Sequence, residues 1–116
     1  MAYHPDCLLC KIIANKEPGK KVWENEAFVA IENKYPKAPI HVLVMPKDHI
    51  EKSDTMYGAT PAFWNDFMAA IAAVIAHYGL DKTGYKFVNN GAGYNHFTHE
   101  HMHVLGGSEE EPAGVT

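Results

Sequence analysis

Three histidines at alternate positions form the most distinctive chemical feature of the sequence. They are His99, His101 and His103, within Thr98-His99-Glu100-His101-Met102-His103-Val104. Residues two apart on a strand point to the same face, so this spacing predicts three imidazoles on one surface. Neutral imidazole is a good nucleophile near pH 7, and neighbouring imidazoles can stabilise charge. A metal site, or histidines that only decorate a half-exposed strand, are the alternatives.

The two cysteines of the chain, Cys7 and Cys10, form a second candidate group. Residues three apart on a helix share one face, so both thiols are expected to point the same way. Such a pair can bind a metal, carry out redox chemistry or pack in the reduced state. A redox role is the least favoured, because the flanking sequence lacks the strand context of a thioredoxin-type motif.

The elements that must position these residues predict an α+β fold with a mainly antiparallel sheet. Turn residues and apolar patterns predict strands over residues 22–24, 28–31, 41–45, 85–89 and 101–105. A short helix is expected over residues 7–15, with Asp6 as its cap, and a long one over residues 61–78, with Thr60 as its cap. Strands and helices do not alternate regularly, which argues against a parallel sheet.

Composition indicates a single domain over residues 1–116. Apolar residues make up 47% of the chain and charged residues 21%, as is typical of globular proteins with one core. The formal charge of −4 gives no general attraction to a nucleic-acid polymer. The start lacks signal-peptide features, and no apolar run reaches the roughly eighteen residues of a membrane span, so we expect a cytoplasmic protein without a membrane partner. The acidic segment 108–116 is expected to be flexible.

Several segments, in the right order, resemble the histidine-triad (HIT) family. The segment from His99 to Gly107 carries His-x-His-x-His followed by apolar residues, which is the family's signature. Residues 7–13 resemble the family's N-terminal helix, and residues 36–50 resemble its proline-rich turn, strand and Pro-Lys-x-His segment. Asn89-Asn90-Gly91 is also similar, so the resemblance extends over nearly the whole chain.

The resemblance implies a HIT-like fold: a five-stranded, mainly antiparallel sheet with two helices, usually paired in a homodimer with a larger combined sheet. It also implies that His101 attacks the α-phosphate of a nucleotide and forms a nucleotidyl-histidine intermediate that water cleaves. His99, His103 and His41 then polarise phosphate oxygens or orient the attacking ring. Positioned donors and charge supply the rate of such transfers, so no metal is required for this chemistry.

Six further positions match the family's substrate contacts, and the expected ligand is a purine nucleotide. These positions are Glu32, Asn33, Lys34, Asn89, Asn95 and His96. Asn33 stands where the family has a ribose-binding aspartate, and Asn95-His96-Phe97 stands where Gln-Ser-Val is usual, so this chain departs from the family at positions that contact the sugar and the leaving group. Residues 33–36 also resemble galactose-1-phosphate uridylyltransferases, but that branch has glutamine at the position of His103.

Bacterial relatives with an N-terminal Cys-x-x-Cys resemble this chain in a way that implies a structural zinc site. Its ligands are Cys7, Cys10, His49 and His99, a set of two thiolates and two imidazoles that suits tetrahedral zinc. In this arrangement His99 is a ligand while His101 remains free as the nucleophile. The alternative is that two reduced cysteines simply pack on the helix.

Three functions follow from these features. The first is a nucleotide hydrolase or transferase that acts on a nucleoside phosphoramidate or a dinucleoside polyphosphate. The second is a nucleotide-binding or scaffold protein with weak or vestigial catalysis. The third is a redox or metal-binding module built on the two cysteines. The three triad histidines together with His41 favour the enzyme.

Overall fold

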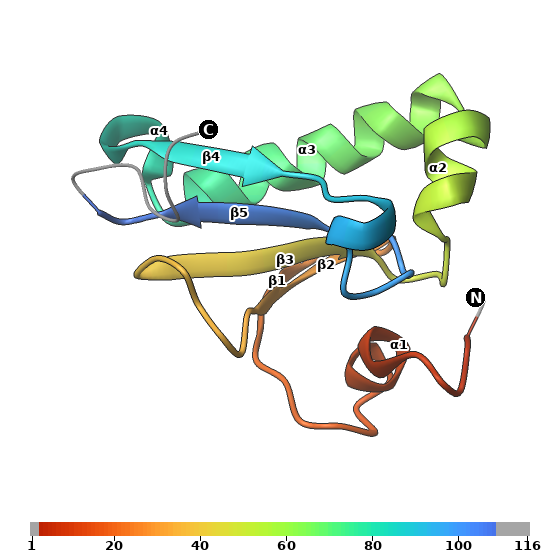
Figure 1. The fold of residues 1–116 in the computed structure, drawn as a ribbon. Coiled ribbons are helices and arrows are strands. Elements are labelled where there is room, and N and C mark those ends of the chain that lie inside the picture. The colour runs from red at the N-terminus through yellow and green to blue at the C-terminus, as the bar shows by residue number, and fades with distance from the viewer. Residues whose placement is uncertain (1–2, 109–116) are drawn as a thin grey trace.

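A computed structural model describes residues 3–108 and contains a five-stranded antiparallel sheet (Figure 1). The strands are β1 (Lys21–Glu24), β2 (Phe28–Glu32), β3 (Ile40–Pro46), β4 (Tyr85–Val88) and β5 (Met102–Gly106). Their order across the sheet is β1-β2-β3-β5-β4. The predicted fold class is therefore confirmed. Apart from Ser108, the predicted flexible tail lies outside the described residues.

The register between the two central strands decides which residues share a face. Leu43 pairs with His103, and His41 pairs with Leu105. Because paired residues point to the same side, the side chains of residues 41, 43, 103 and 105 lie on one face of the sheet. The alternate residues, among them Val42 and Val104, point to the other face.

The long helix α3 (Pro61–His77) covers the face that carries Val42 and Val104 (Figure 1). It begins as predicted: the Thr60 side chain accepts a hydrogen bond from the backbone N–H of Phe63, and Pro61 occupies the first turn. The apolar side of α3 packs on this face of the sheet and forms the larger core. Members of this core include Phe28, Ala30, Val42, Val44, Phe67, Ile71, Val74 and Val104.

Helix α1 (Leu8–Ile13) packs near one end of the opposite face (Figure 1). Leu9 joins a second core with Val29, Ile31, Leu43 and Met45. The cap differs from the prediction, because the sulfur of Cys7, and not Asp6, accepts the hydrogen bond from the backbone N–H of Cys10. The histidine side chains lie on the rest of this face.

Two short helices were not predicted from the sequence: α2 (Lys52–Gly58) and α4 (Leu80–Thr83). Both are too short to show a helical period of apolar residues. Several strand ends differ from the prediction by one residue; among them, β4 ends at Val88 and β5 begins only at Met102. No helix within residues 3–108 has the length and apolar character needed to cross a bilayer.

Candidate functional site

Three imidazoles meet on the face of the sheet that α3 does not cover. His41 comes from β3, His103 from β5, and His101 from the residue just before β5. The ring centroids of His41 and His103 are 5.1 Å apart, and those of His101 and His103 are 5.2 Å apart. His41 and His101 are buried, and His103 is partly buried. The structure thus brings together three of the four predicted catalytic histidines.

The His101 ring is held in one orientation and one tautomer. Its Nδ1 atom lies 2.8 Å from the carbonyl oxygen of His99. A carbonyl oxygen only accepts, so Nδ1 carries the proton and Nε2 keeps its lone pair. Burial lowers the pKa of His101 below its ordinary value, which keeps the ring neutral near pH 7. His101 therefore presents an unprotonated nitrogen, as a nucleophile requires.

His41 and His103 form a chain of donors beside this nitrogen. The backbone N–H of Lys37 donates to His41 Nδ1 at 3.0 Å, so the proton of His41 is on Nε2. His41 Nε2 then donates to His103 Nδ1 at 2.9 Å, which leaves the proton of His103 on its own Nε2. Burial, together with the neighbouring imidazoles of His101 and His41, lowers the pKa of His103 to about 4. His103 is thus a neutral hydrogen-bond donor.

Some of the predicted substrate-binding residues lie beside these histidines. Asn33 Nδ2 is 3.2 Å from His41 Nε2, and Asn33 Oδ1 accepts a hydrogen bond from the backbone N–H of Tyr35. His96 is exposed, and its charge contributes to lowering the pKa of both His101 and His103, which places it near them.

The other predicted substrate-binding residues lie at the rim of the site or form hydrogen bonds with protein groups. Lys34 is exposed, with its ammonium 5.8 Å from the centroid of the Tyr35 ring. The side chain of Asn95 accepts a hydrogen bond from the backbone N–H of Phe97, whose ring centroid lies 5.7 Å from that of His101. Asn89 is exposed, but both ends of its amide bind charged side chains beneath the site.

The prediction that Glu32 lines the same pocket is not supported by the structure. Glu32 pairs in register with Val42, so it points to the face covered by α3. Its carboxylate lies 3.5 Å from the ammonium of Lys20. The preceding residue, Ile31, belongs to the core on the histidine face, and the alternation of a strand therefore directs Glu32 away from it.

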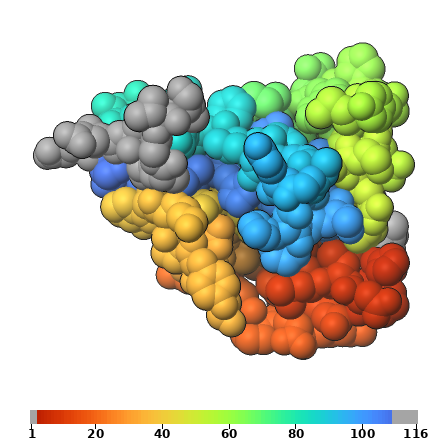
Figure 2. Space-filling view, viewed as in Figure 1, coloured from red at the N-terminus to blue at the C-terminus, as the bar shows by residue number. Residues whose placement is uncertain are grey.

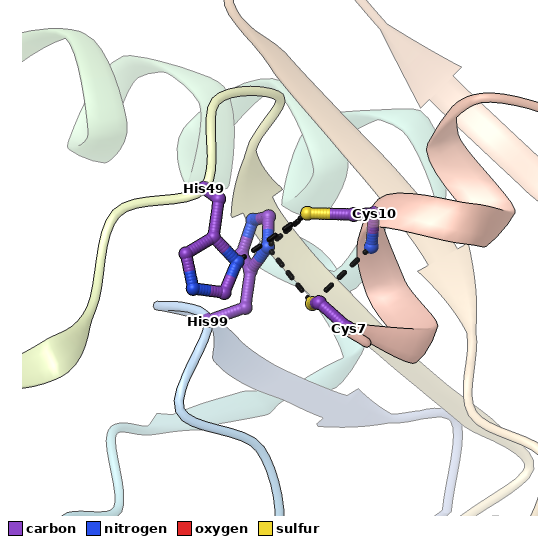
Figure 3. Close-up of side chains that lie close together, drawn as sticks. All are labelled: Cys7, Cys10, His49 and His99. Atoms are coloured by element: carbon purple, nitrogen blue, oxygen red, sulfur yellow. Dashed lines mark hydrogen bonds between the residues drawn. The ribbon is translucent and has the colours of Figure 1, made fainter. Parts of the chain in front are cut away.

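His99 does not converge with the other two triad rings, because its side chain joins the cysteines. Cys7, Cys10, His49 and His99 each offer one ligand atom, and these atoms all lie within 4.8 Å of one another (Figure 3). The cysteines come from the start of α1, His49 from the segment after β3, and His99 from the segment before β5 (Figure 3). This cluster can hold a metal ion.

The spacing of the cluster suits a tetrahedral ion. The Nδ1 atom of His99 is 3.5 Å from each sulfur, and Nδ1 of His49 is 3.3 Å from the sulfur of Cys10. Zinc bonds of about 2.3 Å to sulfur and about 2.0 Å to nitrogen place neighbouring ligands of a tetrahedron about 3.5 Å apart. The observed separations match that edge length.

The outer nitrogens of both histidines are held so that their lone pairs point at the cluster. His99 Nε2 donates to the carbonyl oxygen of Pro46 at 2.7 Å, and His49 Nε2 donates to the Glu51 carboxylate at 3.0 Å. Such second partners fix the tautomer of a metal-binding histidine. Burial raises the pKa of Cys10 to about 11, so a thiolate there requires a nearby cation, which a metal ion supplies.

The sequence analysis did not identify three residues that lie beneath the site: Lys52, Thr55 and Glu100. The Glu100 side chain is 2% exposed and accepts hydrogen bonds from Lys52 and Thr55 of α2. Figure 2 shows the segment after β4, in blue, packed between α1 in red and α2 in yellow-green. Glu100 is two residues before Met102 and four before Val104, and both of these belong to the core. A carboxylate in such a row of core positions is the sequence signal that could have indicated the buried ion pair.

Comparison with known proteins identifies the class to which this fold and histidine arrangement belong. The sequence profile of the HIT domain matches residues 14–110. The chain therefore belongs to the HIT domain family.

Individual relatives support this assignment. A HIT-like protein of Chlamydia muridarum is 36% identical over 99 residues, which cover 84% of this chain and 78% of that protein. A histidine triad protein from Clostridium difficile is 30% identical with a TM-score of 0.83, covering 93% of this chain and 96% of its own. A HIT family hydrolase from Legionella pneumophila is 30% identical with a TM-score of 0.81, covering 89% and 94%.

Proposed function

We propose that this protein hydrolyses a nucleotide at its α-phosphate through a covalent intermediate on His101. The observation that carries the proposal is the tautomer of His101. Its Nδ1–H is bound to the His99 carbonyl, so the lone pair of Nε2 is available on the uncovered face of the sheet. The same family includes a protein from Legionella pneumophila named as a hydrolase, which supports this class of reaction.

The proposed reaction has two displacements. In the first, His101 Nε2 forms a bond to the α-phosphorus while the bond to the leaving group breaks, and the leaving group takes the electron pair of that bond and a proton from solvent. In the second, the oxygen of water bonds to phosphorus, the phosphorus–Nε2 bond breaks with its electron pair returning to Nε2, and one water proton passes to solvent. The Nε2–H of His103, oriented by His41, donates to a phosphate oxygen in both steps.

We propose a purine nucleotide as the substrate, and the side chains around the three rings are compatible with it. A purine nucleotide places its phosphate beside His101 and His103 and its ribose near Asn33, whose amide adjoins His41. Lys34 and Asn89 lie at the rim of the nucleoside site. The leaving group lies toward Asn95 and His96. Nucleoside phosphoramidates and dinucleoside polyphosphates both fit this arrangement, because each carries a leaving group on an α-phosphate.

A turnover assay with a mass measurement tests the proposal. The protein is incubated with adenosine phosphoramidate or with diadenosine polyphosphates, and the acid-sensitive adduct is sought in protein quenched at high pH. We expect AMP release and a transient nucleotidyl adduct on the peptide that contains His101. Binding of AMP without turnover of either substrate would instead support a nucleotide-binding protein with vestigial catalysis.

Nucleotide binding itself gives a second prediction. Asn33→Ala is expected to weaken AMP binding about tenfold, the effect of losing one hydrogen bond of about 1 kcal/mol or slightly more. Calorimetric titration with AMP and GMP measures the effect. Lys20→Ala serves as the control, because Lys20 pairs with Glu32 away from the site and its loss is expected to change nothing. No binding of either nucleotide at millimolar concentration would contradict the pocket.

We also propose that the protein forms a homodimer through the edge strand β4. This strand is the last in the sheet order, and the rings of Tyr85 and Phe87 are exposed and stacked, with centroids 6.4 Å apart. Bare edge strands with exposed apolar residues favour pairing with a second chain, most simply across a two-fold axis.

Light scattering tests the dimer. We expect a particle with twice the 12.9 kDa mass of one chain, and we expect Phe87→Lys to shift the population toward the monomer. A single species with the mass of one chain at micromolar concentration would contradict this proposal.

A further inference from the structure

A buried ion pair lies directly beneath His101. The ammonium of Lys52 is 2.7 Å from Oε1 of Glu100, and the two side chains are 10% and 2% exposed. Lys52 donates to Oε1 of Glu100 and Thr55 donates to Oε2, so both oxygens of this carboxylate have a partner. A buried ion pair contributes little net stability compared with apolar residues of the same volume. The groups that this pair contacts therefore indicate its role.

Both charged groups bind the backbone of one residue, His101. Glu100 Oε1 accepts from the backbone N–H of His101 at 2.8 Å. Lys52 Nζ donates to the carbonyl oxygen of His101 at 2.8 Å. The single ion pair thus engages the backbone N–H and the backbone carbonyl of one residue, which belong to the two peptide units on either side of its Cα.

The two hydrogen bonds to the backbone of His101 lie at the end of the sheet. The pairing of β4 with β5 ends at Val88 and His103, and β5 itself begins at Met102. His101 therefore lies beyond the end of β4, where strand pairing no longer fixes the backbone. The ion pair supplies the two hydrogen bonds that a neighbouring strand would otherwise provide.

The pair is itself held on every side. The three ammonium protons of Lys52 go to Glu100 Oε1, to the carbonyl of His101 and to Asn89 Oδ1, the last at 3.0 Å. Asn89 Nδ2 returns a hydrogen bond to Glu100 Oε1 at 3.1 Å. Thr55 Oγ1 donates to the other carboxylate oxygen, Oε2. A largely buried network in which both carboxylate oxygens and all three ammonium protons have partners is rigid.

We propose that Lys52 and Glu100 are positioning residues that hold the backbone of His101 and thereby aim its ring at the substrate. With that backbone fixed, Nδ1–H stays on the carbonyl of His99, and Nε2 keeps both its direction and its lone pair. The inference rests on the proposed role of His101 as the nucleophile. It assigns a task to two charged side chains that do not themselves touch the substrate.

The kinetic test replaces the pair by apolar residues of similar size, in the variant Lys52→Met with Glu100→Leu. A pair that only supports the fold would tolerate this change. A pair that positions His101 would not, and we expect kcat to fall about 10- to 100-fold while KM changes less than about threefold. Glu100→Gln keeps the acceptor for the His101 N–H and is expected to retain kcat within about fivefold of the wild type.

Thr60→Ala is the control for stability. Its hydroxyl accepts a hydrogen bond from the backbone N–H of Phe63 at the start of α3, which covers the face of the sheet opposite the histidines. It should lower the melting temperature and leave kcat close to that of the wild type. If the double variant does not fold, Lys52→Gln provides the same comparison, because it removes the charge and shortens the side chain that donates to the His101 carbonyl while Thr55 and Asn89 still hold Glu100.

A nitrogen-15 NMR measurement of labelled histidines separates positioning from turnover. In the wild type we expect His101 with a protonated Nδ1 and an unprotonated Nε2, and in the double variant a mixture of both tautomers. If the wild type hydrolyses no nucleotide, the proposed function fails, yet this spectrum still decides the positioning. A double variant that keeps both the wild-type kcat and the single tautomer would overturn the inference.

Discussion

His101→Ala is expected to lower kcat/KM for nucleotide hydrolysis at least about 10⁴-fold, the order of loss seen when a covalent nucleophile is deleted. The physical reason is that the Nδ1 lone pairs of His41 and His103 already accept hydrogen bonds, from Lys37 N–H and from His41 Nε2–H, in the tautomers that the contacts indicate. Neither ring has a free lone pair that could replace that of His101 Nε2. The nucleotidyl adduct should disappear together with the activity.

A fold defect must be separated from the loss of the nucleophile, because His101 is 2% exposed and its truncation leaves a cavity. His101→Gln is therefore measured beside the alanine variant, since its amide can still donate to the His99 carbonyl and fills more of the space. Both variants should be inactive and the glutamine variant nearer to wild-type stability. His77→Ala, at the exposed end of α3, provides the histidine control. Activity of either His101 variant within about tenfold of the wild type would rule out the assignment.

The main elements of this fold could be predicted because their signals are local. Thr60, Pro61 and Gly79 bracket α3, and the apolar run over residues 41–45 marks a central strand. Helix α2 could not be predicted in the same way. Its seven residues show no helical period, and what holds it in place is Thr55 bonded to Glu100, 45 residues away in the sequence. Contacts of that separation leave no periodic pattern in the chain.

Part of the candidate site could be predicted, because reactive residues such as clustered histidines are rare and therefore stand out in the sequence. Histidines at alternate positions indicated a site, but strand periodicity alone could not show that the His99 ring turns to the cysteines while its carbonyl holds His101. Glu32 shows the converse error. It is adjacent in sequence to Asn33 at the site, but the alternation of β2 directs its side chain to the far face. The prediction placed Glu32 at the site because it precedes Asn33 in the sequence, but the alternation of side chains along β2 determines the face to which Glu32 points.

Removal of metal is expected to destabilise the protein strongly, because we propose that Cys7, Cys10, His49 and His99 bind one zinc ion per chain. Helix α1 has six residues, too few to be stable alone, and the cluster ties its first turn to the segments that flank the sheet. Ligand binding at a thousand times its dissociation constant stabilises a fold by about 4 kcal/mol, and losing that corresponds to a melting temperature lower by roughly 15 °C for a domain of this size.

Elemental analysis and a melting curve test the site together, on protein purified without chelators. We expect about one zinc per chain in the wild type, and less than about 0.2 after both cysteines are changed to serine. A zinc chelator should lower the melting temperature of the wild type but not that of the double serine variant. His4→Ala is the matched control: its ring stacks 4.9 Å from that of His49 while contributing no ligand atom to the cluster, so its zinc content should equal that of the wild type. Zinc retained by the double serine variant would place the metal elsewhere, and a wild type with less than about 0.2 zinc per chain would leave two reduced cysteines packed against His49 and His99.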